Sequence, residues 1–256
     1  MNSKKLIKKL WKKFPLKLAK KYHDYVGLMV SKVKEETNKI IVCLDVNNDV
    51  IDLAIFENVD LFISHHPFIY GKKKYVLLDE YKLNMYKRLE DAKIPVYSFH
   101  TNFDEGIDGM NDALLRALSV NNIRPIPNLE IGRMGELSSP MIIKDFASYA
   151  LSNLSLDYCQ LIGDENKVIR TIGIIGGSGS RDYKLAYEAR CDLFISGDTP
   201  YHIRKELIDK GYNYLHLDHE VEKIFITQMS DILLDINPDL EVIGFNDVRQ
   251  AKLITK

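Results

Sequence analysis

The chain has 256 residues, of which 46% are hydrophobic and 28% are charged, and this composition argues against a mainly disordered protein. Its 35 Lys and Arg residues nearly balance 36 Asp and Glu residues, and a net charge of −1 argues against a dedicated nucleic-acid-binding protein. The three cysteines have no Cys-x-x-Cys spacing, which argues against a disulfide framework or a cysteine zinc site. No apolar run approaches the roughly 20 residues of a transmembrane helix. We therefore expect a cytoplasmic protein that does not span a membrane.

The N-terminal segment is rich in lysine, with nine lysines and no acidic residue through Lys21. Its apolar residues recur at helical spacing, from Leu6 to Phe14, rather than forming a signal-peptide core. This pattern predicts an amphipathic helix that packs on the core and ends at Pro15. A role at a membrane surface or on nucleic acid is the alternative.

Strand and helix signals alternate along the rest of the chain, which is typical of α/β units with parallel strands. In the first half we expect strands at 40–46, 61–64 and 95–99, and helices at 49–57, 80–91 and 110–118. In the second half we expect strands at 171–175, 193–196 and 213–217, and helices at 144–154, 182–189, 201–210 and about 220–234.

The stretch from 121 to 140 is rich in Asn, Pro and Gly, which indicates a connection between two lobes. The pentapeptide DLFIS occurs at 60–64 and again at 192–196, each time in the order strand, helix, DLFIS, helix, strand. The sequence therefore predicts two similar α/β lobes related by internal duplication. The first lobe is expected to span 1–125 and to be completed by 219–256, and the second to span 126–218.

Six of the seven histidines lie near the ends of predicted strands or at the start of the next helix: His65, His66, His100, His202, His216 and His219. Ligands of open parallel sheets bind beyond the carboxyl ends of the strands, so these side chains are candidates for a common site.

His65 and His66 directly follow a predicted strand and precede Pro67, which favours an extended backbone. Adjacent side chains of an extended segment point to opposite sides, so each histidine would serve one of two neighbouring metal ions. The alternative is one buried core histidine and one exposed one. Asp104 lies in the loop after the next strand and would bridge two cations, although such an aspartate is more often a turn residue, and Asp108 would cap the following helix.

His219 and Glu222 are three residues apart at the start of the last predicted helix and would share a face. A neutral nitrogen with a carboxylate oxygen is the ligand set of zinc, iron or manganese rather than calcium. The alternative is a solvated pair on a charged helix.

The GGSGS segment comprises Gly176, Gly177, Ser178, Gly179 and Ser180 and lies between a predicted strand and helix. Its amides would bind a phosphate or other anionic substrate group, or the segment is only a tight turn. Asp198, Tyr201 and His202 follow the matching strand of the second lobe, and His202 is a candidate catalytic proton donor or acceptor.

The segments SHHPFIYG, HTNFDEGIDGMNDALL, IGRMGELSSPM, GGSGS, DLFISGDTPYH and DHEVEKI resemble, in this order, those of the Nif-three-like dinuclear-metal family, also labelled GTP cyclohydrolase 1 type 2 homologue. LKLAKKYHDYVGLMV is similar to the family's opening segment. The resemblance implies a Nif-three-like fold, a toroidal homohexamer and two divalent ions per subunit. The ligands that it implies are His65, His66, Asp104, His219 and Glu222. Many members space the last two by four residues, but position 223 here is Lys223, which leaves Glu220 as the alternative carboxylate.

Two ions with five protein ligands leave coordination positions open, as in catalytic metal sites. The sequence therefore predicts a metal-dependent hydrolase that acts on a nucleotide-like or phosphorylated small molecule, and the family label points to the imidazole ring of GTP. A non-catalytic metal-binding or scaffold protein is the alternative function.

Overall fold

The computed structural model describes residues 1–255, which divide into two compact units. Unit 1 consists of Met1–Ile107 and Phe225–Asp247, and unit 2 of Asp108–Ile224 and the segment that begins at Val248. The domain boundaries expected from the sequence stay a prediction.

Unit 1 is built around a five-stranded sheet of order β1-β4-β3-β2-β11. Strands β4, β3, β2 and β11 are parallel, whereas β1 pairs antiparallel with β4. The strands are β1 (Gly27–Val30), β2 (Lys39–Cys43), β3 (Leu61–Ser64), β4 (Val96–Ser98) and β11 (Glu241–Phe245). The helices are α1 (Ser3–Lys13), α2 (Leu16–Lys21), α3 (Asn48–Phe56), α4 (Lys73–Val76), α5 (Glu80–Asp91), α6 (Thr101–Glu105) and α11 (Ile224–Ile236).

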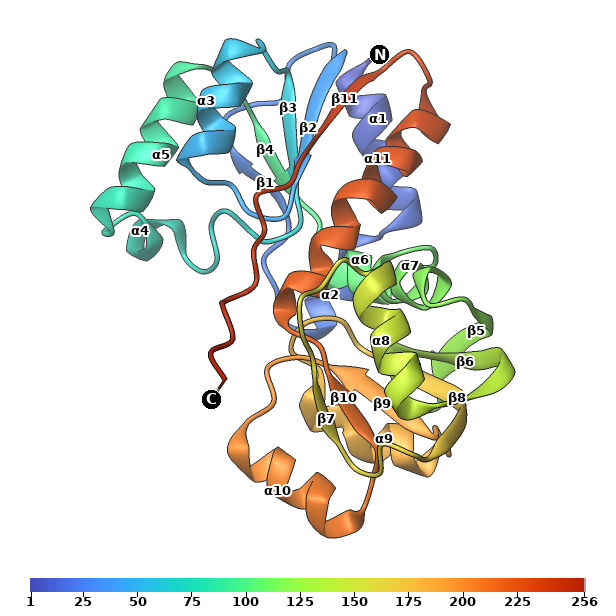
Figure 1. Ribbon diagram of the computed structural model, residues 1–256. Helices are drawn as coiled ribbons and strands as arrows, with labels where there is room; N and C mark the ends of the chain where they lie inside the picture. The colour runs from blue at the N-terminus through green and yellow to red at the C-terminus, as the bar shows by residue number, and fades with distance from the viewer. Residues whose placement is uncertain (256) are drawn as a thin grey trace. The chain divides into compact units, whose positions relative to one another are not determined.

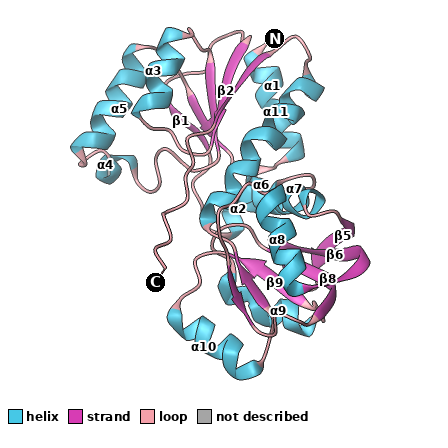
Figure 2. Cartoon of the chain, viewed as in Figure 1, coloured by secondary structure: helices cyan, strands magenta, loops and turns pink. Residues whose placement is uncertain are grey.

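Helices cover both faces of this sheet, with α3 and α5 on one side and α1 and α11 on the other (Figures 1 and 2). All four residues of β3 are buried, as expected for a strand covered on both faces. The predicted N-terminal helix is confirmed: Leu6, Ile7 and Leu10 of α1 are buried, while its lysines face outward.

Unit 2 is built around a six-stranded sheet of order β5-β6-β8-β9-β10-β7. Only β8, β9 and β10 are parallel to one another, and the other strands pair antiparallel. The strands are β5 (Val120–Ile126), β6 (Leu129–Ile142), β7 (Gln160–Ile162), β8 (Val168–Ile174), β9 (Leu193–Ser196) and β10 (Tyr214–His216). The helices are α7 (Met110–Ala117), α8 (Ile143–Asn153), α9 (Tyr183–Glu188) and α10 (Tyr201–Lys210), with short 3₁₀ helices η1 (Ser180–Asp182) and η2 (His219–Lys223).

The stretch 121–140, expected to be a connection, instead belongs largely to the long antiparallel pair β5–β6. Pro125 lowers the strand signal, but it is tolerated because β5 is an edge strand, where a missing N–H need not break the sheet. Both sheets are therefore mixed: each contains the expected parallel strands, and antiparallel strands are added at the edges.

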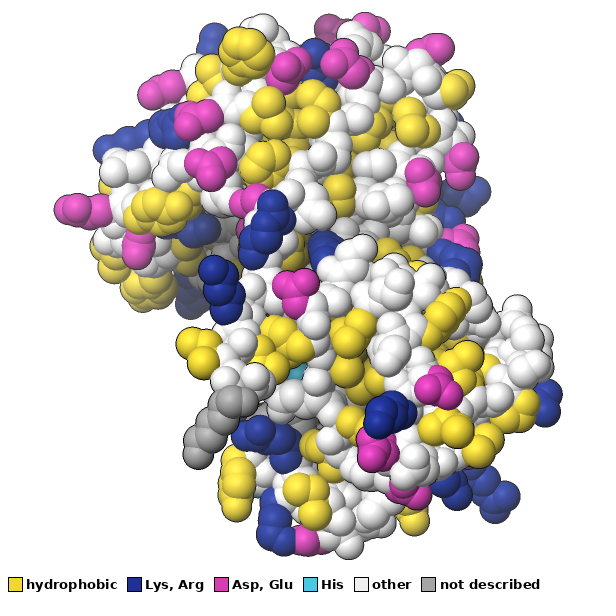
Figure 3. Space-filling model, viewed as in Figure 1, with side chains coloured by type: hydrophobic (Ala, Val, Ile, Leu, Met, Phe, Trp, Pro, Cys, Tyr) yellow, Lys and Arg dark blue, Asp and Glu magenta, His cyan; other side chains and the backbone are white. Residues whose placement is uncertain are grey.

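The predicted fold class is confirmed, because each unit is an α/β structure with an LFIS strand inside its sheet, β3 in unit 1 and β9 in unit 2. Basic and acidic side chains are interspersed on the surface of both units in the face seen in Figure 3. The helices within residues 1–255 are all too short or too polar to cross a membrane.

Candidate metal centre

His65 and His66 follow β3, and their amides extend its pairing by donating to Cys43 O and Leu44 O. The chain bends at both histidines, and their ring centroids lie 5.1 Å apart. The two rings therefore lie close together rather than on opposite sides, contrary to the geometry expected of a fully extended segment. His65 is completely buried, whereas His66 is half-buried.

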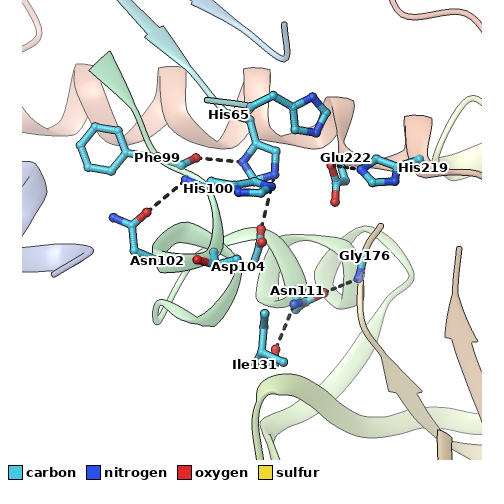
Figure 4. A network of polar contacts seen from close by, with 12 residues as sticks. His65, Phe99, His100, Asn102, Asp104, Asn111, Ile131, Gly176, His219 and Glu222 are labelled. Carbon is cyan, nitrogen blue, oxygen red and sulfur yellow. Dashed lines mark hydrogen bonds and ion pairs between the residues drawn. The ribbon is translucent and has the colours of Figure 1, made fainter. Parts of the chain in front are cut away.

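A hydrogen-bond acceptor lies next to the Nδ1 atom of each of these two rings. His65 Nδ1 lies 2.9 Å from Phe99 O, which can only accept, so Nδ1 donates and Nε2 carries the lone pair of the neutral ring (Figure 4). His66 Nδ1 lies 2.8 Å from Asp45 Oδ1. Histidine ligands of metals are oriented in this way by acceptors behind the ring.

Asp104 lies on the short helix α6, immediately beyond β4. Its Oδ1 atom is 3.6 Å from His65 Nε2, and the residue is buried. The start of α6 is fixed by Asn102, which accepts from the His100 amide and donates to Phe14 O. The structure thus brings together three of the predicted ligands within unit 1: His65, His66 and Asp104.

His100 joins this group, although the resemblance did not imply it as a ligand. One ring nitrogen from each of His65, His66 and His100 lies within 4.8 Å of the others. His100 Nδ1 lies 2.7 Å from Asp24 Oδ2. The sequence contained a signal, since His100 opens the HTNFD segment, but its anchor Asp24 lies 76 residues away in the chain.

The Asp24 side chain is nearly enclosed and receives hydrogen bonds from four groups: the His100 ring, the Thr101 hydroxyl, and the amides of Thr101 and Tyr25. Burial alone would raise the pKa of Asp24, but the hydrogen bonds from His100 and Thr101 and the charge of His100 outweigh it and lower the pKa. Asp24 therefore stays ionised and fixes the orientation of His100.

In unit 2, His219 and Glu222 lie on η2 rather than on the α-helix expected there. A 3₁₀ helix has three residues per turn, so residues 219 and 222 stand directly above one another. His219 Nε2 lies 3.0 Å from Glu222 Oε2, and His219 Nδ1 lies 2.7 Å from Asp198 Oδ2. Glu222, rather than Glu220, is thus the carboxylate paired with His219.

The two carboxylates determine the protonation of His219. The hydrogen bond and charge of Glu222, together with those of Asp198, raise the pKa of His219 to about 9 although burial opposes this. The Glu222 side chain is buried, whereas the His219 ring is 37% exposed. A divalent cation could replace the proton between these two side chains.

The GGSGS turn packs against this pair. Gly177 has φ +62°, and a Cβ atom there would collide with Glu222 Oε1 and lie 3.0 Å from Glu222 Cδ. The Gly176 amide donates to Asn111 Oδ1 at 2.7 Å, and Asn111 Nδ2 donates to Ile131 O at 2.9 Å (Figure 4). The turn therefore needs glycine at 177 so that Glu222 can approach it.

Two amides of the predicted anion cradle already have protein acceptors, because Gly176 N donates to Asn111 and Gly179 N donates to Ser196 Oγ. His202 is exposed on the first turn of α10. The substrate-binding role of the turn and the catalytic role of His202 both stay predictions.

Known proteins resemble the chain over most of its length. Relatives from Clostridium acetobutylicum and Clostridium perfringens, each named a GTP cyclohydrolase 1 type 2 homolog, are 33% and 32% identical. The first match covers 70% of this chain and 69% of the relative, and the second covers 77% of each.

Solved structures share the fold. A Bacillus cereus protein related to NIF3 has a TM-score of 0.88 at 18% identity, with 100% of this chain and 99% of that chain covered. A Staphylococcus aureus protein has a TM-score of 0.89 at 19% identity with the same coverage. The family model described as Duf34/NIF3 (NGG1p interacting factor 3) matches residues 1–249, which confirms the resemblance seen in the sequence. The chain therefore belongs to the Duf34/NIF3 family.

Proposed function

We propose that this protein is a hydrolase that depends on two divalent metal ions and acts on a nucleotide-like or phosphorylated small molecule. The observation that carries the proposal is the orientation of the histidines. Acceptors hold Nδ1 of His65, His66 and His219, which leaves Nε2 as the ligand atom of each ring.

The residues fit transition-metal ions. The proposed ligands are His65, His66 and Asp104 of unit 1 and His219 and Glu222 of unit 2, as the family resemblance implies. Imidazole nitrogens mixed with carboxylate oxygens suit zinc, iron or manganese. When bound, such ions act as Lewis acids and make water a nucleophile near neutral pH.

Other residues of the chain would handle the substrate. We propose that the amides of the GGSGS turn that remain available, such as that of Ser178, receive an anionic group, and that His202 exchanges a proton with the substrate. The name shared by the clostridial relatives makes GTP the first substrate to test. A toroidal homohexamer is the proposed assembly.

The first experiment measures metal. Elemental analysis of the purified protein should find close to two divalent ions per chain. Asp104→Ala should remove both ions if this carboxylate bridges them, and Asp91→Ala at an exposed position should serve as a control with unchanged content. Full metal occupancy in the Asp104 variant would contradict the assignment.

The second experiment measures turnover of GTP and of generic phosphoesters by the metal-loaded protein. Activity should vanish with a chelator and return when zinc, manganese or iron(II) is added. His202→Ala should lower turnover and leave the metal content intact. A wild-type protein that holds both ions and turns over none of these compounds would favour the metal-carrier or scaffold function instead.

A further inference from the structure

Strand β1 forms one edge of the unit 1 sheet, and within residues 1–255 it pairs only with β4. Every second residue of an edge strand directs its N–H and C=O groups away from the sheet. Leu28 on this strand is 47% exposed. An extended peptide can add to such an edge through backbone hydrogen bonds.

A groove runs along β1. It consists of two hollows of about 610 and 370 Å³ that share three lining residues, Leu28, Met29 and Lys73. Tyr86 of α5 also lines the larger hollow, and Ile69 also lines the smaller one. Because both hollows are lined by Leu28 and Met29 of β1, the groove offers apolar contacts to side chains of a strand laid beside it.

The walls of the groove are basic. The groove is lined by five lysines: Lys20, Lys32, Lys34, Lys73 and Lys93. The two carboxylates that line it are Glu90, which accepts from the Ser31 amide at 2.8 Å, and Asp24, which is held by His100. Lys34 pairs with Asp60, but Lys73 contacts only the neutral Tyr86 in the interactions described, with Nζ 4.0 Å from the ring centroid. The groove is therefore locally positive on a chain whose net charge is −1.

We propose that this groove binds an acidic, extended segment of a partner protein, which adds to β1 as a further strand of the sheet. Alternate apolar side chains of the segment pack on Leu28, which is 47% exposed. Its Asp or Glu side chains pair with Lys32, Lys73 and Lys93 at the walls. Backbone hydrogen bonds to β1 fix the register of the bound segment. The charge of the lysines favours an acidic segment over a neutral or basic one.

The test uses the full chain and a fluorescently labelled eight-residue peptide of alternating valine and glutamate, followed by anisotropy. We expect saturable binding that weakens as salt rises, since the ion pairs are exposed. The double variant Lys32→Glu/Lys73→Glu should weaken binding by about tenfold or more. The matched control, Lys4→Glu/Lys8→Glu on the exposed face of α1, should stay within about twofold, and equal loss in both variants would contradict the proposal.

A second peptide separates strand addition from charge alone. The same sequence with N-methyl groups on alternate amides keeps its charge but lacks half of the donors needed to pair with β1. It should bind at least tenfold more weakly. Equal binding of both peptides would overturn strand addition. Failure of the unmodified peptide, with a change of oligomeric state in the Lys32→Glu/Lys73→Glu variant, would mean that a second copy of this chain occupies the edge.

Discussion

Asp192 makes in unit 2 the same contacts that Asp60 makes in unit 1. Asp60 Oδ2 accepts from the amides of Asn38 and Lys39, which lie 22 and 21 residues earlier in the chain. Asp192 Oδ2 accepts from two amides at the same separations, those of Arg170 and Thr171. The first residue of each DLFIS segment thus fixes two consecutive amides of the neighbouring chain, at the start of β2 in unit 1 and within β8 in unit 2.

These hydrogen bonds predict that each of the two aspartates stabilises the unit in which it lies. Asp60→Asn and Asp192→Asn keep the size of the side chain but replace a carboxylate acceptor with a neutral amide. Each should lower the free energy of unfolding by about 1–2 kcal/mol at pH 7, as for other hydrogen bonds to charged groups. Urea unfolding measures the change, and Asp91→Asn at the exposed end of α5 is the control.

The loss of unfolding free energy caused by Asp60→Asn should depend on pH. Burial would raise the pKa of Asp60, but the hydrogen bonds from Lys34 and from the two amides outweigh it and lower the pKa below the ordinary 3.8. A depressed pKa stabilises the fold above the unfolded-state value and ceases to do so as pH falls through the folded-state value. The difference between wild type and Asp60→Asn should therefore shrink below about pH 4. A difference that stays constant down to pH 2 would contradict this origin.

Much of the fold could be predicted because local signals agreed with the final packing. The strands at 61–64 and 193–196 and the helices at 80–91 and 201–210 match the structure residue for residue. Their apolar runs and caps are strong, as with Asp79, whose side chain accepts from the Lys82 amide at the start of α5. The pair β5–β6 could not be predicted, because its strand character comes from pairing and its composition is that of a loop.

The site was only partly predictable for a similar reason. The sequence placed His65, His66 and Asp104 near one another because they follow adjacent strands. The role of Asp24 behind His100 and the contact of Gly177 with Glu222 depend on residues that are distant in sequence. The 3₁₀ turn at 219–223 was also missed, since the charged residues there suit an α-helix equally well.

The pairing of His219 with Glu222 predicts which glutamate supports metal binding. Glu222→Gln removes a buried carboxylate that lies 3.0 Å from His219 Nε2, so metal affinity should fall by about tenfold or more. Glu220→Gln changes a more exposed residue on the same turn and should leave affinity within about twofold. Competition with a colorimetric chelator measures both. Loss of affinity in the Glu220 variant alone would reverse the assignment.

Alanine substitutions at two glycines with nearly equal φ distinguish the effect of steric crowding at Glu222 from that of backbone strain. Gly177 has φ +62° and faces Glu222, whereas Gly211 has φ +59° and nothing within 4 Å of a Cβ atom. Alanine at either position costs about 1 kcal/mol of stability because a left-handed backbone disfavours a side chain. Only Gly177→Ala should also weaken metal binding, since it displaces the Glu222 carboxylate. Similar metal affinity in the two alanine variants, measured by titration with cobalt(II), would show that the contact has no role in ligation.

The pKa of His219 predicts how the metal-free protein responds to base. Its pKa is raised from 6.5 to about 9 by Glu222 and Asp198, so the folded state binds the proton more tightly than the unfolded chain does. Such a group stabilises the fold fully below pH 6.5, and this contribution is lost as the pH rises through about 9. In the presence of a chelator, His219→Gln should therefore be less stable than wild type at pH 6, and the two should converge near pH 10. Urea unfolding at intermediate pH values measures the convergence.

With metal bound, the wild-type protein should instead lose stability toward low pH, because protons then compete with the ion for the imidazole. A metal-free wild type whose stability relative to His219→Gln does not change between pH 6 and 10 would show that the histidine is not protonated against these carboxylates.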